Sequence, residues 1–192
     1  QFKSFSECSM LEEVIIPPSV TVIEANAFMK CQLLKKVSIS SSVKIIEGGV
    51  FQDCESLEEI TIPPLITSIC DNTFKGCKNL KEIKIQSSLV TIGNLAFCGC
   101  VSLVQITLPP SLTSIGERAF ENCSSLENIS IPSLVNKIGK RCFDKCNSLT
   151  KVLIHSSLIS IESGTFQRCT NLTEILFPSS LVSIGDYSMR DC

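Results

Sequence analysis

The sequence has few of the features that most enzymes, nucleic-acid-binding proteins and membrane proteins share. Its 192 residues include one histidine, His155, and no second histidine or matched nucleophile with which it could act as a general base. With 17 Lys and Arg against 19 Asp and Glu, the net charge of -2 offers no electrostatic attraction for nucleic acid or an anionic membrane. No apolar run approaches the roughly 18 residues that span a bilayer. We therefore expect no catalysis, no nucleic-acid partner and no membrane insertion by this segment.

What the sequence does have is a 23-residue unit that recurs without insertion or deletion, of which residues 51–73 are one copy. The unit opens on a phenylalanine, found at Phe5, Phe28, Phe51, Phe74, Phe97, Phe120, Phe143 and Phe166, with Met189 in the ninth position. A cysteine follows three residues later, at Cys8, Cys31, Cys54, Cys77, Cys100, Cys123, Cys146, Cys169 and Cys192. A fixed period of roughly 20 to 50 residues is typical of a solenoid.

The pattern inside each unit predicts its local structure. Residues 57–62 alternate apolar and polar side chains, which indicates a half-buried strand. Pro63 and Pro64 end it, because proline cannot donate a hydrogen bond to a sheet. Residues 117–123 are too few for an independent helix, so we expect a single helical or 3₁₀ turn there. Stacked units would form a parallel sheet with strands about 4.8 Å apart.

This repeat overrides the one or two globular domains that the length alone suggests. We predict a single leucine-rich-repeat-like array over residues 1–192, with about eight units. Gln1 and Cys192 both fall within repeats, and neither end shows the polar cap that solenoids ordinarily need. The first ten residues also lack the apolar stretch of a signal peptide. We therefore expect either a longer natural chain or end-to-end self-association.

The repeat pattern is clearest from Leu103 to Cys123, as Leu-x-x-Ile-x-Leu-Pro-x-x-Leu-x-x-Ile-Gly-x-x-Ala-Phe-x-x-Cys. It resembles the BspA-like class of leucine-rich repeats, and the resemblance covers essentially the whole sequence. It implies a curved solenoid of the kind found in surface proteins of bacteria and parasitic protists, with adhesion as a proposed role. Because the motif is structural, it carries no functional residues with it.

Nine of the twelve cysteines share one position of the repeat, so they should form a column facing the core. Adjacent members would lie about 4.8 Å apart with parallel side chains. That separation exceeds the Cβ distance of roughly 3.5 to 4.5 Å in disulfides, so we expect buried free thiols. A column also does not converge on a point as zinc ligands must. Of the remaining three, Cys70, Cys98 and Cys142, we expect Cys98 to be the most exposed thiol and Cys142 to face inward.

The outward positions of the predicted strands divide the array into two halves. In the first units they alternate in charge: Glu12, Lys35, Glu58 and Lys81 in one column, and Glu13, Lys36 and Glu59 in the next. Such columns predict cross-strand ion pairs on a solvated face.

Toward the C-terminus the outward columns mix apolar and polar residues, which often marks an interaction site. The candidate partner-binding residues are Asn128, Ser130, Lys151, Leu153, His155, Glu174 and Leu176. The alternative is that Leu153 and Leu176 only cover the end of the array, and Ile15 occupies the same column at the other end. No cofactor or metal is expected.

These observations predict a non-enzymatic scaffold that binds a protein partner of unknown identity. The resemblance favours part of a surface adhesion protein, at the cell surface or outside the cell. The alternative is a cytoplasmic structural or assembly scaffold, which the reduced cysteines favour because oxidising compartments usually convert cysteines to disulfides.

Overall fold

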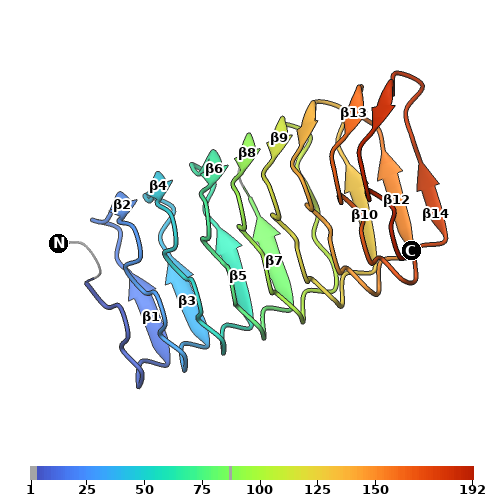
Figure 1. Ribbon diagram of the computed structural model, residues 1–192. Helices are drawn as coiled ribbons and strands as arrows, with labels where there is room; N and C mark the ends of the chain where they lie inside the picture. The colour runs from blue at the N-terminus through green and yellow to red at the C-terminus, as the bar shows by residue number, and fades with distance from the viewer. Residues whose placement is uncertain (1–3, 87) are drawn as a thin grey trace.

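The computed structural model describes residues 4–86 and 88–192, which form a solenoid whose turns stack along one axis (Figure 1). Each turn combines a long strand, a short strand and a series of β-turns. The long strands are β1 Glu13–Ile16, β3 Lys36–Ile39, β5 Glu59–Ile62, β7 Glu82–Ile85, β10 Asn128–Ile131, β12 Lys151–Ile154 and β14 Glu174–Leu176. The short strands are β2 Val22–Ile23, β4 Ile45–Ile46, β6 Ser68–Ile69, β8 Thr91–Ile92, β9 Ser114–Ile115, β11 Lys137–Ile138, β13 Ser160–Ile161 and β15 Ser183–Ile184.

All strand pairs are parallel and in register at one repeat, as in Glu59 beside Glu82. The long strands form two sheets, β1-β3-β5-β7 and β10-β12-β14. They are separate because residues 105–108, the equivalent segment of the repeat between them, form no strand. Ile106 and Leu108 are nevertheless buried there. The predicted inward and outward alternation therefore holds in this repeat, whereas the predicted strand does not.

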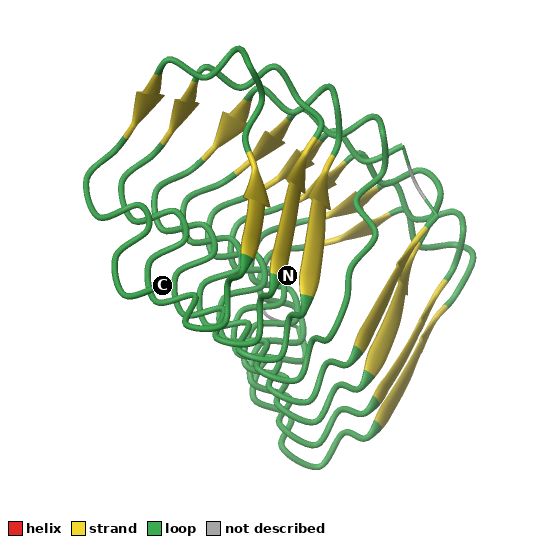
Figure 2. Cartoon of the chain, turned by 90° about the vertical axis from the view of Figure 1, so that its right-hand side faces the viewer, coloured by secondary structure: helices red, strands yellow, loops and turns green. Residues whose placement is uncertain are grey.

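The short strands lie on a second side of the solenoid (Figure 2). They pair as β2-β4, β6-β8-β9-β11 and β13-β15. The middle group continues across the break in the long-strand sheets, because β8 pairs with β9 and β9 pairs with β11. The two halves of the array are thus joined by hydrogen bonds on this side.

The third side consists of β-turns, formed by residues 117–123 and their equivalents in every repeat; we call it the turn edge. Backbone N–H groups here donate to the following repeat, for example Phe97 N to Ala119 O at 2.7 Å. The parallel sheets and the 23-residue stacking confirm the predicted fold, but the described residues form no helix or 3₁₀ segment on this edge.

The reason is that two residues in each turn have left-handed backbone conformations, which interrupt a helix. The first column contains Asn26, Gly49, Asn72, Leu95, Arg118, Arg141, Gly164 and Tyr187, with φ between 53° and 67°. The second contains Glu7, Lys30, Asp53, Gly76, Gly99, Asn122, Lys145, Arg168 and Asp191. Left-handed geometry costs a residue other than glycine roughly 1 to 2 kcal/mol, least for Asn and Asp. Stacking of the repeats compensates for this cost.

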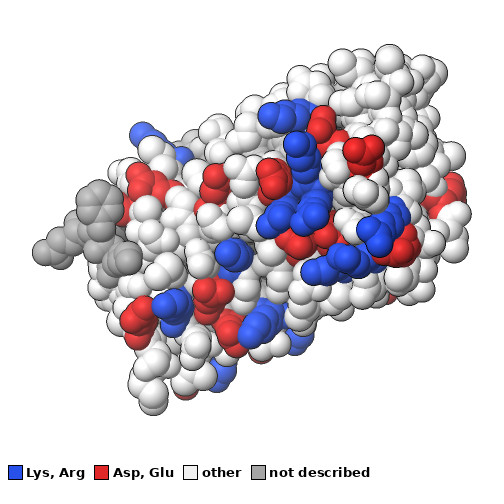
Figure 3. Space-filling model, viewed as in Figure 1, with Lys and Arg blue, Asp and Glu red and all other residues white. Residues whose placement is uncertain are grey.

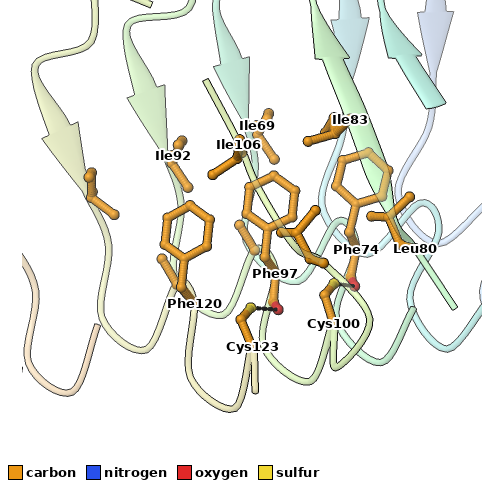
Figure 4. Packing of buried hydrophobic residues seen from close by; sticks show 14 of the residues in the cluster. Ile69, Phe74, Leu80, Ile83, Ile92, Phe97, Cys100, Ile106, Phe120 and Cys123 are labelled. Carbon is orange, nitrogen blue, oxygen red and sulfur yellow. Dashed lines mark hydrogen bonds between the residues drawn. The ribbon is translucent and has the colours of Figure 1, made fainter. Parts of the chain in front are cut away.

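The core is one continuous cluster along the solenoid axis, built from the apolar repeat positions. The phenylalanine rings from Phe5 to Phe166 stack face to face, with neighbouring centroids 5.1–5.8 Å apart and planes within 13° of parallel. Figure 4 shows this stack beside the isoleucines of the strands. The regular ring spacing confirms that successive turns repeat the same side-chain packing.

Candidate partner-binding surface

The cysteine column forms a hydrogen-bonded ladder inside the core. Each thiol from Cys31 onward donates to the carbonyl of the phenylalanine in the preceding repeat, as Cys100 Sγ does to Phe74 O and Cys123 Sγ to Phe97 O, both at 3.2 Å (Figure 4). Burial raises the pKa of these thiols, for Cys54 to about 12. All twelve cysteines are free, in agreement with the sequence-based expectation. Their role in the structure is packing and hydrogen bonding between turns.

The expected burial fails only at the first and last members of the column. Cys8 is partly exposed and Cys192 is exposed, so Cys192 rather than Cys98 is the most accessible thiol. Cys142 is buried as predicted, while Cys98 and Cys70 are partly exposed. The described residues contain no group of three metal-ligating side chains, and none of their elements is an apolar helix of membrane-spanning length.

In the N-terminal half, the outward face of the long strands is lined by cross-strand ion pairs. Lys35 Nζ lies 3.0 Å from Glu12 Oε2, and Lys81 Nζ lies 3.1 Å from Glu58 Oε2. Lys36 pairs with Glu13 at 3.6 Å. All of these side chains are about half exposed, so each pair contributes little to stability. The predicted charged columns are confirmed, and the charges on this half compensate one another within the sheet.

In the C-terminal half, β10, β12 and β14 bring most of the predicted site residues side by side. Asn128 lies beside Lys151 and Ser130 beside Leu153. On the next strand, Glu174 lies beside Lys151 and Leu176 lies beside Leu153. His155 is exposed just beyond the end of β12.

These residues differ in what they offer a partner. Lys151 Nζ is 3.0 Å from Glu174 Oε2, so these two charges compensate each other. Leu176 is 55% exposed, but Leu153 is only partly exposed, contrary to the expectation that both would be fully accessible. Leu176 is thus the main apolar contact available on this face, with Leu153 beside it.

Two adjoining hollows occupy the outward face next to the interrupted repeat. One, of about 330 Å³, is lined by Gln105, Ile106, Thr107, Asn128, Ile129, Ser130, Lys151 and Leu153. The other, of about 400 Å³, is lined by Ile106, Thr107, Leu108, Pro110, Ser130, Pro132, Ser133 and His155. Glu174 and Leu176 line neither. The prolines and Ser133 lie outside the strands, where the alternating pattern gives no signal, and sequence reasoning missed them.

Comparison with known proteins gives one family. The profile of the BspA type leucine rich repeat region matches residues 1–102 and 67–192, in six copies. A leucine rich cell surface protein from Faecalibacterium prausnitzii is 30% identical, with a TM-score of 0.75 over 91% of this chain and 57% of that chain. This chain therefore spans little more than half the length of that relative. No curated protein matches.

Two further solved structures share the architecture. The leucine rich repeat protein of T. pallidum is 29% identical, with a TM-score of 0.65, and the match covers 91% of this chain and 73% of that chain. A leucine-rich repeat protein from Bacteroides ovatus is 22% identical, with a TM-score of 0.54 over 94% of this chain and 73% of its own, and supports the fold alone. The matched repeats extend over the full sequence. The chain belongs to the BspA type leucine rich repeat family.

Proposed function

We propose that this chain is a non-enzymatic, protein-binding scaffold that forms part of a surface adhesion protein. The observation that carries the proposal is the pair of adjoining hollows beside β10 and β12, where a mainly apolar lining lies next to polar side chains such as Asn128, Ser130 and His155. Solenoids present extended surfaces of this kind for binding. The cell-surface description of the Faecalibacterium relative supports the location.

The proposed contact residues are Asn128, Ser130, Lys151, Leu153, His155, Glu174 and Leu176, acting as one surface of a single array. Asn128 and Ser130 offer amide and hydroxyl groups at the first hollow, and His155 lies at the second. Leu176 extends this surface beyond the hollows as its exposed apolar contact. Mixed surfaces of this type favour specific protein contacts over general adhesiveness.

The test is adhesion of the immobilised chain to purified extracellular-matrix proteins, such as fibronectin and fibrinogen. Replacing Leu176 with lysine and Ser130 with glutamate should abolish binding with nearly unchanged thermal stability. The matched control is Ile15→Lys, because Ile15 occupies the same outward column at the other end and is 72% exposed. Loss of stability with binding intact would assign Leu176 to packing and refute the proposed surface.

The rival function, a cytoplasmic scaffold, rests on the free thiols. The thiols of the column point to backbone carbonyls and not to one another, so free thiols here are compatible with an oxidising compartment as well. Labelling intact cells with an antibody against the chain, with and without permeabilisation, distinguishes the two locations. Signal only after permeabilisation would favour the cytoplasmic scaffold.

We further propose that copies of the array associate end to end. Phe5 at one end and Ile184 at the other occupy apolar repeat positions and are exposed. Light scattering across a range of concentrations tests this. A constant monomer mass up to high concentration would contradict it.

A further inference from the structure

All four arginines of the chain lie on the turn edge of the last four repeats. They are Arg118, Arg141, Arg168 and Arg190, and with Lys145 they form what we call the arginine edge. The cations of the long strands, in contrast, are all lysines. Figure 3 shows Lys and Arg side chains gathered with a few acidic ones over the C-terminal half of the visible face. A chain with a net charge of -2 thus carries a local concentration of cations, mostly guanidinium groups.

None of the four guanidinium groups makes a hydrogen bond within the described part of the chain, although Arg118 Nε is buried and only its other nitrogens can serve a partner. For Arg118, Arg168 and Arg190 the paired carboxylate oxygens are 3.5–4.0 Å away, as for Arg118 Nε and Glu121 Oε2 at 3.8 Å. Such distances exceed the 2.7–3.2 Å of N–H···O hydrogen bonds. The lysines at the starts of the long strands, in contrast, form pairs as short as 3.0–3.1 Å. The sheet charges satisfy one another, whereas the arginine edge retains unused donors.

Three of the arginines occupy positions that favour other residues. Arg118, Arg141 and Arg168 have φ of 54°, 53° and 58°, in the two columns where some other repeats carry glycine or asparagine and the rest carry Leu, Tyr, Glu, Lys or Asp. The fold therefore has a less strained choice at each position, and this chain carries arginine instead. Strain kept at a surface position is a reason to suspect function there.

Two nearly buried carboxylates lie beneath the cations and orient them outward. Asp144 Oδ1 is 3.7 Å from Arg168 Nη1, and Glu121 Oε1 is 4.0 Å from Lys145 Nζ. The Asp144 and Glu121 side chains are 2% and 16% exposed, while the cations they face are 45% exposed. Glu117 and Asp191, beside Arg118 and Arg190, are 55% and 53% exposed, so the accessible part of this cluster carries both signs with the cations in excess.

The geometry points to an acidic protein segment as the partner of the arginine edge; we propose that it binds a helix with a stripe of carboxylates. Cations in one column repeat at the spacing of the turns, which the ring centroids give as 5.1–5.8 Å. Side chains three or four residues apart on a helix are about 5–6 Å apart, so the two spacings match. Guanidinium forks bind carboxylates with two parallel hydrogen bonds, which lysine cannot do. This surface is separate from the hollows at β10 and β12.

The probe is a fluorescent alanine-based helical peptide with glutamates at i and i+4 along one face, measured by anisotropy. The test variant combines Arg118→Gly, Arg141→Gly and Arg168→Gly, which removes three cations and relieves backbone strain, so that it folds. The control combines Lys35→Gln, Lys78→Gln and Lys81→Gln, with the same change in net charge. We expect at least 30-fold weaker binding for the arginine variant and less than threefold for the control.

Three results would overturn the proposal. The first is an equal loss of peptide binding in the arginine and lysine variants, which would mean that net charge alone determines the binding. The second is equal binding of a peptide with glutamine in place of glutamate. The third is arginine-dependent binding of heparin without binding of the glutamate peptide, which would assign the edge to a sulfated polysaccharide. A lysine variant of the same three arginines that binds the glutamate peptide more weakly than the wild type, but more tightly than the glycine variant, would support bidentate recognition of carboxylates.

Discussion

Raising the pH should unfold this protein at a value where most proteins are still stable, because its core contains thiols that the fold keeps protonated. Seven are buried with strongly raised pKa: Cys54, Cys77, Cys100, Cys123, Cys142, Cys146 and Cys169. Desolvation is the main cause in each. In the unfolded chain the same thiols ionise near pH 8.5.

The sign and size of this pH effect on the free energy of unfolding follow from the difference in proton binding between the folded and unfolded states. Above about pH 8.5 the unfolded state loses thiol protons that the folded state retains, so the free energy of unfolding falls as pH rises. At pH 9.5 each such thiol costs about 1.4 kcal/mol of stability relative to neutral pH. Seven together cost roughly 10 kcal/mol, which is comparable to the whole stability of a typical domain at about 5–15 kcal/mol. Below about pH 7.5 nearly the full stability should remain.

The assay is urea unfolding at pH 7.5, 8.5 and 9.5, with a phosphine reductant to prevent oxidation. In Cys100→Ser, the hydroxyl can still donate to Phe74 O but does not ionise, so this variant should lose about 1.4 kcal/mol less than the wild type over that range. Cys192→Ser, at the exposed end of the column, should change the pH dependence much less. The reasoning would be refuted if the wild type lost less than about 2 kcal/mol of unfolding free energy between pH 7.5 and 9.5. It would also be refuted if the unfolding free energy of Cys100→Ser fell with pH in parallel with that of the wild type.

Three further predictions concern packing and surface charge, each measured by chemical denaturation at pH 7. Gly116→Ala should destabilise by about 2 kcal/mol or more, since the new Cβ would lie 2.5 Å from the backbone carbon of Gly93 in the preceding turn; a neutral result would mean that the turns can separate. Leu95→Asn should stabilise by about 0.5–1 kcal/mol, because φ is 56° there and asparagine tolerates that conformation; a loss would show that packing of the leucine dominates. Lys81→Gln should change stability by less than about 0.5 kcal/mol, since its pair with glutamate is exposed, and a larger loss would contradict the view that the sheet charges are solvated.

The sequence was enough to predict the parts of this fold that depend on side-chain burial. The fixed period placed Phe97 and Cys100 in their columns, and the structure confirms the stack and the free thiols. Alternation alone predicted which residues of β5 and β10 face outward. These features repeat in each unit, so each copy supports the assignment of the others.

The backbone details could not be predicted, because unlike residues occupy equivalent positions. Leu95, Arg118 and Tyr187 are not residues that signal left-handed turns, so the short helical or 3₁₀ turns expected on this edge were wrong. The sequence also does not signal that residues 105–108 form no strand, since their side chains follow the same apolar and polar alternation as the other repeats. Of the candidate site, the neighbours on β10 and β12 followed from the register, but the hollows depend on that break and on prolines outside the strands.

The hydrogen bonds between turns run in both directions along the axis of the solenoid. On the turn edge, Phe97 N donates forward to Ala119 O, whereas on the short-strand side Gly116 N donates backward to Ile92 O. Aligned peptide dipoles add along a helix and leave partial charges at its ends. Here the forward and backward sets oppose each other, so their dipoles largely cancel along the axis. Such an array can be lengthened repeat by repeat without accumulating electrostatic polarity.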